Sequence, residues 1–471
     1  MSVVRGLAAG NAAYVVQTVV RLFTTAIVAR LISPEEMGIW TLGFALIGTF
    51  QILRDFGTAT YIQTSNELSN EDIRICNGLQ LVVGIFFFIV FLAAAQPVAS
   101  FYNEPRVAEV IYVLALGFLI MPLSSTTFNL FVRDGRFALK SGIDFVSQMC
   151  MYAGGVLFAY LGASHLSAPI AVVIAQVLVV LICFFYRNKE YSLGYSFSNV
   201  SRVAKLSSTA LSVSLLQHAS DRSPDFVLPK AQGFAQSSMY EKGVNCLELV
   251  KLAVVELIGS VLVSSLRLRA AKDPSIFSSL ASNTLSTMML FAVLGASLLA
   301  VNGHEFLLTL FGAQWVEARH SLVILAFATP FVCMTAFLTK VMYLRDMHAL
   351  ALKTSVVTRV CVILIVLLFC RSSLTSLATA IVAAEITFAL FYVYLNRNNL
   401  DLSAFLKPML VDSIIIVSSV LAASAAVKVT GVNNHFASLL LNGLFSGAMV
   451  CIVIFATRKS TLHRLRFCLN L

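Results

Sequence analysis

A polar stripe inside an apolar segment is the first feature of this sequence that could do chemistry. The stretch 11–31 is long enough to cross a bilayer, which takes about 20 mostly apolar residues. It nevertheless carries Asn11, Tyr14, Gln17 and Arg21, whose steps of three, three and four place them on one face of a helix. A cation at that depth needs a bundle interior or a water-filled cavity. Arg21 therefore either pairs with a carboxylate and locks the bundle, or forms part of a polar wall that meets an anionic substrate.

Two later apolar segments carry polar residues at a similar helical spacing. The first holds Ser207, Ser214, Gln217, His218 and Asp221, and the second holds Glu241, Asn245, Glu248 and Lys251. Arg54 and Asp55 stand near the end of a further segment. One stripe could be a packing seam, and Glu248 and Lys251 could simply neutralise each other as an ion pair three residues apart. Three stripes together favour a shared wet cavity.

The chemistry of the basic residues favours an anionic ligand. A guanidinium group binds phosphate oxygens through two parallel hydrogen bonds, so Arg21 and Arg54 suit a diphosphate. We expect Gln17, Gln217, Asp221 and Asn245 to contact the rest of the substrate, and Lys251 to add positive charge. Glu248 is the candidate for coupling to a proton or sodium ion.

The composition identifies a polytopic membrane protein. Of the 471 residues, 58% are hydrophobic and 12% are charged, and the mean hydropathy is +0.87, which excludes a soluble globular domain. The nine cysteines include no C-x-x-C pair, and the seven histidines show no metal-ligand spacing. The sequence also has no phosphate-binding glycine loop, so we expect no metal, no cofactor and no ATP-driven motor.

Apolar segments of spanning length follow one another along the whole chain. The hydropathy pattern predicts about fourteen spans, near 11–31, 38–60, 78–97, 107–131, 143–161, 167–185, 205–222, 242–265, 279–301, 320–343, 355–371, 374–395, 407–427 and 436–457. Lysine and arginine concentrate in alternate loops, which the positive-inside rule assigns to the cytoplasm together with both termini. The net charge of +10 reflects this bias and attraction to anionic lipid, and needs no nucleic-acid partner.

The span pattern divides the chain into four parts. We expect an N-terminal lobe of six spans at 1–186, a cytoplasmic linker at 187–204, a second six-span lobe at 205–396, and two further spans with a cytoplasmic tail at 397–471. Two similar halves joined by a linker are typical of transporters that work by alternating access. No loop is long enough to form a soluble domain.

Two motifs carry a resemblance to a known family. The first runs from Ala29-Arg30-Leu31-Ile32-Ser33-Pro34-Glu35-Glu36-Met37-Gly38 through Trp40 to Asp55-Phe56-Gly57 and Ile62-Gln63, and the second is Leu310-Phe311-Gly312-Ala313-Gln314-Trp315-Val316-Glu317-Ala318. Together they resemble the polysaccharide-transporter branch of the MOP superfamily, the Wzx-type oligosaccharide flippases. Pro229 and Ser238 stand where that pattern would have glycines, and beyond about residue 400 only the hydropathy is similar.

The resemblance implies an all-α membrane fold with two six-helix lobes around a central cavity lined by spans one, two, seven and eight. It implies that Arg21, Arg54 and, more loosely, Lys251 match the basic cavity positions of related lipid-diphosphate flippases. It also implies that Ser33–Gly38 is a structural turn in which Pro34 opens the next helix and Gly38 permits close packing.

The function implied is transport, not catalysis. We expect a flippase that moves undecaprenyl-diphosphate-linked oligosaccharides across the bacterial inner membrane for exopolysaccharide, O-antigen or a similar polymer. Its partners would be the lipid-linked oligosaccharide, the phospholipid bilayer, and a polymerase and glycosyltransferases of the same pathway. The alternatives are a multidrug or cation exporter of the same superfamily, which needs an acidic cavity, and a polysaccharide polymerase or ligase, which needs a large outer loop.

Overall fold

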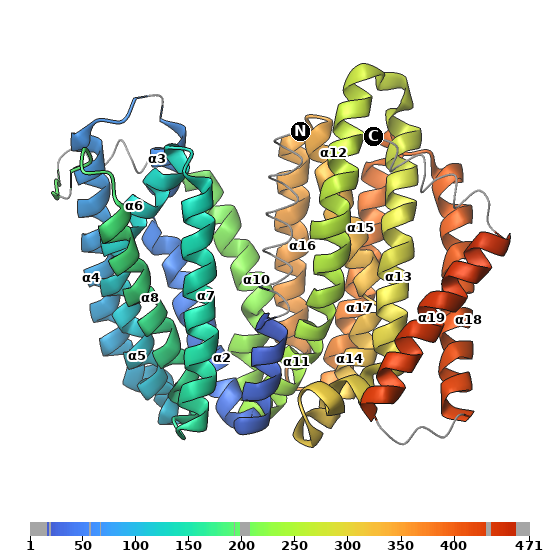
Figure 1. Cartoon of the computed structure of the whole chain (residues 1–471), viewed down its shortest axis with the longest axis horizontal. Coiled ribbons are helices and arrows are strands. Elements are labelled where there is room, and N and C mark those ends of the chain that lie inside the picture. Colours follow the sequence, from blue (N-terminus) through green and yellow to red (C-terminus); the bar gives the residue numbers. More distant parts are fainter. Residues whose placement is uncertain are drawn as a thin grey trace. The chain divides into compact units, whose positions relative to one another are not determined.

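The computed structural model describes residues 17, 20–55, 58–65, 67–192, 194–197, 208–429 and 435–457 (Figure 1). The side chains of Arg54 and Asp55 lie outside this description, as do residues Asn11 and Tyr14. All regular secondary structure within these ranges is helical. The chain forms two compact units, Met1–Ser238 and Met239–Leu471, which are taken separately.

The first continuous helix described in unit 1 covers residues 20–31, and its end overlaps the first sequence motif, which starts at Ala29. The remaining helices of this unit are α2 (Pro34–Asp55), α3 (Thr58–Thr64), α4 (Asn70–Tyr102), α5 (Arg106–Ile120), α6 (Pro122–Arg133), α7 (Phe137–Tyr160), the 3₁₀ turn η1 (Ser164–Leu166), α8 (Ser167–Tyr186) and α10 (Ser208–Gln232). Helix α11 (Phe234–Lys251) starts in unit 1 and continues into unit 2.

Unit 2 is also a helical bundle. After α11 come the π-helix η2 (Leu252–Ile258), α12 (Gly259–Lys272), η3 (Pro274–Ile276), α13 (Phe277–Leu310), η4 (Ala313–Ala318), α14 (Arg319–Ala326), α15 (Thr329–Leu344), α16 (His348–Phe369), α17 (Leu374–Leu395), η5 (Arg397–Asn399), α18 (Leu402–Val429) and α19 (His435–Thr457). Helices α18 and α19 pack against each other and both pack against α13.

Eight helices of the described chain are long and apolar enough to cross a membrane, and ten if each of two bent pairs forms one span. The chain is thus a multi-pass membrane protein, while the predicted count of fourteen spans stays a prediction. The sequence predicted one span for each of these pairs, and both are bent: α5 and α6 meet at 53°, and the η4–α14 stretch meets α15 at 49°. A proline opens α6 and another lies in the first turn of α15, where its missing N–H breaks the preceding helix without an unsatisfied donor.

Aromatic rings fill the core of unit 1. Phe91 stacks on Phe118 with ring centres 5.2 Å apart, and Phe50 of α2 meets Phe91 edge-on at 4.9 Å. These pairs join α2, α4 and α5, whose packing is further tightened where Gly43 faces Val110. Offset and edge-to-face aromatic pairs add about 0.5–1.5 kcal/mol each beyond the area they bury.

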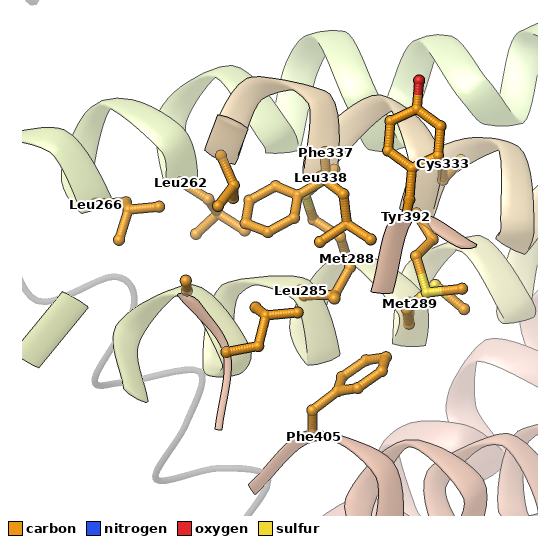
Figure 2. Close-up of a cluster of buried hydrophobic side chains, with 14 of the residues drawn as sticks. Leu262, Leu266, Leu285, Met288, Met289, Cys333, Phe337, Leu338, Tyr392 and Phe405 are labelled. Atoms are coloured by element: carbon orange, nitrogen blue, oxygen red, sulfur yellow. The ribbon is translucent and has the colours of Figure 1, made fainter. Parts of the chain in front are cut away.

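The core of unit 2 is mostly aliphatic and sulfur-containing. Figure 2 shows Leu262 and Leu266 of α12 facing Leu285, Met288 and Met289 of α13, with side chains from α15, α17 and α18 closing the cluster. Methionine fills irregular gaps because its unbranched side chain has three rotatable bonds. Phe337 and Phe405 are almost fully buried in this cluster and link it to α15 and α18.

The described part of the predicted linker is bound to helix α4. Arg74 Nε donates to Ser192 Oγ at 2.8 Å, and the Ser196 N–H donates to the Arg74 carbonyl at 2.9 Å. The Tyr191 hydroxyl donates to Asp134 at 2.6 Å, and burial beside that carboxylate raises the pKa of Tyr191 to about 12. The predicted boundary between lobes at 187–204 stays a prediction, whereas the two compact units divide at Ser238 and helix α10 packs on α2 within unit 1.

Candidate functional site

The first sequence motif contains the N-terminus of helix α2, which is capped by side chains of the motif itself. Ser33 Oγ donates to the Glu36 carboxylate at 2.9 Å and accepts from the Glu36 N–H at 3.3 Å, so the two residues cap helix α2 reciprocally. Pro34 is the first residue of that helix. The predicted structural turn is therefore present, and its polar groups are used in capping.

Close packing at Gly38 is the second feature of this motif. A Cβ atom placed on Gly38 would lie 2.3 Å from the carbonyl oxygen of Phe234, so only glycine fits there without a shift of backbone. Ser238, which stands where the family pattern would have glycine, donates through Oγ to the Pro34 carbonyl at 2.6 Å. The serine thus adds a hydrogen bond between the start of α11 and the start of α2.

Arg21 is exposed on the helix over residues 20–31. Among the side chains that the structure describes, none forms an ion pair with it. Gln17, one turn earlier, is half-buried. The second interpretation of Arg21, a charged group available to an anion, stays a prediction.

Arg54 cannot be placed to the same extent. Its backbone belongs to the last turn of α2, which ends at Asp55, but its side chain lies outside the described part. Its pairing with Arg21 around one diphosphate therefore stays a prediction.

Helix α10 presents the predicted seventh-span stripe. Gln217 and Asp221 are both exposed, four residues apart on one face. His218 points instead toward α2, since its ring lies 3.1 Å from the position that a Cβ on Gly48 would take. Its buried Nε2 atom has no hydrogen-bond partner among the described residues. Ser207 and the side chain of Ser214 lie outside the described residues, and the rest of the stripe consists of two exposed polar residues and one histidine between α2 and α10.

The predicted eighth-span stripe is in unit 2. Lys251 Nζ lies 2.9 Å from Glu248 Oε1, and both side chains are almost half exposed. Asn245 donates to Glu241 at 3.3 Å. The ion pair that was one interpretation of Glu248 and Lys251 is present, and its exposure leaves both groups accessible to a ligand.

A π-helix begins directly after Lys251 and runs over Leu252–Ile258. Such segments are rare and frequently mark functional sites. It contains Glu256, an exposed carboxylate five residues beyond Lys251, which the sequence interpretation missed. Residues five apart do not share a face of an α-helix, so the sequence pattern did not group Glu256 with Lys251. Only the π-helix in the structure identifies Glu256 as a candidate.

Lys242 is the other residue that sequence reasoning missed. It lies at 3% exposure on α11, with Nζ 5.1 Å from the centre of the Phe311 ring and 5.0 Å from that of Trp315. Both aromatic residues belong to the second sequence motif, so this motif covers a buried cation. Among the described residues no group of three or more histidine, cysteine or carboxylate side chains could hold a metal ion.

Comparison with known proteins agrees with this architecture. A family model described as "Polysaccharide biosynthesis protein" matches residues 27–320. Over 314 residues the chain is 22% identical to the succinoglycan biosynthesis transport protein ExoT of Rhizobium meliloti strain 1021, covering 65% of this chain and 62% of ExoT. It is 22% identical over 180 residues to the lipopolysaccharide biosynthesis protein WzxC of Escherichia coli K12, covering 38% of this chain and 37% of WzxC. The matches thus span less than two thirds of these relatives.

Solved structures show the same fold at low sequence identity. The lipid II flippase MurJ in an inward closed conformation superposes with a TM-score of 0.78 at 12% identity, covering 95% of this chain and 98% of MurJ. An inward-facing multidrug resistance MATE transporter of the MOP superfamily gives 0.64 at 14% identity, covering 81% of this chain and 94% of that one. With its family match over more than half its length, the chain belongs to the polysaccharide biosynthesis protein family, and it has the same fold as these solved structures.

Proposed function

We propose that this protein moves undecaprenyl-diphosphate-linked oligosaccharide units across the bacterial cytoplasmic membrane, for export of exopolysaccharide, O-antigen or a similar polymer. Both termini would face the cytoplasm, and the protein would work by alternating access, as a transporter and not an enzyme. A polymerase and glycosyltransferases of the same pathway would be its partners. Relatives named for succinoglycan and lipopolysaccharide biosynthesis support this substrate class.

The single observation that carries the proposal is the exposed guanidinium of Arg21 on an apolar helix. An arginine within a membrane span is expensive to bury, and it remains charged where water or a ligand reaches it. Its planar fork matches the oxygens of a diphosphate and offers nothing specific to a cationic drug. A lipid-linked sugar diphosphate is the membrane substrate with that headgroup.

The remaining site residues take roles that follow from their charge and exposure. Arg54 would share the diphosphate with Arg21, and Gln17, Gln217 and Asp221 would contact the sugar. Lys251 would add positive charge and Asn245 a hydrogen-bonding amide. Glu248, paired with Lys251, would take up the coupling ion when the substrate leaves.

The membrane potential would assist the outward step. Moving one charge across the membrane changes the free energy by about 2.3 kcal/mol per 100 mV. An inside-negative potential pushes the two negative charges of the diphosphate outward. Ion uptake by Glu248 would therefore serve mainly to return the empty carrier.

A headgroup-flipping assay with the purified protein in proteoliposomes tests the proposal. Arg21→Ala should lower the initial flipping rate by roughly 100-fold, since losing a charge-assisted bidentate contact costs about 1.5–3 kcal/mol or more in a water-poor site. Arg21→Lys, which keeps the charge but loses the fork, should retain an intermediate rate. Arg30→Ala, an exposed arginine on the same helix, is the control. Wild-type rates in both Arg21→Ala and Arg54→Ala would remove the diphosphate role.

A further inference from the structure

An open apolar groove runs along the same helix that carries Arg21. One wall is formed by Val20, Thr24, Ile27 and Leu31, which recur in steps of four, three and four and therefore share one helix face. The groove has a volume of about 720 Å³, within the range of roughly 300–1,000 Å³ typical of ligand clefts. It lies wholly within unit 1.

The opposite wall is helix α7. Tyr152, Val156 and Tyr160 lie along it at steps of four, and Ala153 leaves the middle of the wall shallow. Several of the lining residues are widely exposed: Leu157 at 53% and Tyr160 at 79%. In a membrane-spanning bundle such a groove opens to lipid and can admit a hydrocarbon chain from the side.

The groove has a cation at one end. Arg21 directly follows Val20, the first described residue of this helix to line the groove, and Tyr152 lines the other wall. From Val20 to Leu31 the groove follows eleven residues of helix, about 16 Å at 1.5 Å per residue. A guanidinium next to an apolar channel of that length complements a lipid with an anionic headgroup and a long unbroken chain.

We infer that this groove binds the polyprenyl chain of the lipid whose diphosphate is held by Arg21. The inference rests on the proposed function and names the part of the protein that holds the lipid tail. Moving the polyprenyl chain from the bilayer into the groove releases little hydrophobic free energy, because the bilayer is as apolar as the groove walls. Its contribution is positional: it aligns the chain next to the diphosphate so that the headgroup reaches Arg21.

Site-specific photo-crosslinking tests this assignment. A benzophenone amino acid is placed at Leu157 in the groove, and in a second protein at Phe86 of α4, which is similarly exposed at 58% but does not line the groove. Both proteins are placed in phosphatidylethanolamine–phosphatidylglycerol vesicles that contain radiolabelled undecaprenyl diphosphate. The Leu157 probe should capture that lipid several-fold above the Phe86 probe, and Arg21→Ala should remove the excess. Equal capture at both positions would overturn the inference.

A transport experiment separates this inference from the proposed function. Ala153→Trp fills the groove, and Ala93→Trp places the same side chain on an exposed alanine of α4 as the control. The wild-type protein should flip a long-chain polyprenyl diphosphate sugar faster than a short-chain analogue, and Ala153→Trp should abolish that preference while Ala93→Trp keeps it. If the preference survives in Ala153→Trp, the groove is not the tail site, although flipping itself stands. If the wild-type protein flips neither lipid, the proposed function fails as well.

Discussion

The ammonium nitrogen of Lys242 lies 5.0 Å from the centre of the Trp315 ring, and both residues are almost wholly buried. Phe311 presents a second ring to the same ammonium at 5.1 Å. A cation over an aromatic face gains about 2 kcal/mol where water is absent. The second sequence motif therefore stabilises unit 2 by accommodating a charge that the helix would otherwise bury at high cost.

Removing the Trp315 ring should destabilise unit 2 more than removing the charge. Trp315→Ala should lower the free energy of unfolding by about 3–5 kcal/mol, because it leaves a cavity and removes an aromatic partner from the buried ammonium of Lys242. Lys242→Met keeps most of the side-chain volume and should cost less. Denaturation of the detergent-solubilised single and double variants gives the coupling energy. A coupling near zero, with transport lost only in Lys242→Met, would instead place the lysine in contact with substrate.

A methyl group at Gly38 should strain the first motif. Its Cβ would lie 2.3 Å from the Phe234 carbonyl, which is backbone and cannot rotate away. We expect Gly38→Ala to destabilise unit 1 by about 1–3 kcal/mol. Gly142→Ala is the matched control, since a Cβ there meets nothing within 4 Å. That helix substitution should be neutral or stabilising by about 0.5–1 kcal/mol, and equal effects of the two changes would contradict the packing.

The Glu104–Arg106 pair should make the stability of unit 1 sensitive to acid. Arg106 Nε lies 2.8 Å from Glu104 Oε1, and this hydrogen bond holds the pKa of Glu104 below its usual range. Because the pKa of Glu104 is lower in the folded than in the unfolded protein, its ionised form stabilises the fold at pH values above the unfolded pKa of about 4.3. This stability is lost as the pH falls through the folded-state pKa. Melting temperatures between pH 7 and pH 3 should therefore drop less steeply in Glu104→Gln. An exposed carboxylate, Glu67, provides the control through Glu67→Gln. An unchanged slope in Glu104→Gln would argue against this linkage.

Neutralising Glu248 should separate ion coupling from substrate binding. Because its carboxylate pairs with Lys251 at 2.9 Å, Glu248→Gln leaves the lysine free to bind phosphate more tightly. We expect a lower apparent KM for the lipid-linked substrate and a flipping rate that no longer responds to a proton or sodium gradient. Lys251→Gln should do the opposite to KM. Retained gradient dependence in Glu248→Gln would move the coupling site elsewhere, with exposed Glu256 the next residue to change.

Much of the fold could be predicted from the sequence because apolar length and periodicity are direct signals of membrane helices. The start of α2 at Pro34 and the close approach at Gly38 were also predicted, whereas the capping of this helix by Ser33 and Glu36 was not. The bends before α6 and α15 did not, because uninterrupted hydropathy conceals a change of helix direction.

The candidate site was predictable only in part. Periodicity placed Arg21 on a polar face, and the structure leaves it exposed. The burial of Lys242 could not be foreseen, since its partners Phe311 and Trp315 lie about seventy residues later in the sequence. Glu256 was hidden because a π-helix shifts the register on which stripe counting depends. The apolar groove between the helix over residues 20–31 and α7 could not be predicted either, because it depends on the packing of two helices distant in sequence.

The most direct test measures which membrane leaflet holds the lipid-linked oligosaccharide after the gene for this protein is deleted from its own organism. We expect a strain that lacks this chain to accumulate undecaprenyl-diphosphate-linked oligosaccharide on the cytoplasmic leaflet and to lose the surface polymer. The wild-type gene should restore export, and the Arg21→Ala gene should not. Normal surface polymer with no accumulated precursor in the deletion strain would contradict the account.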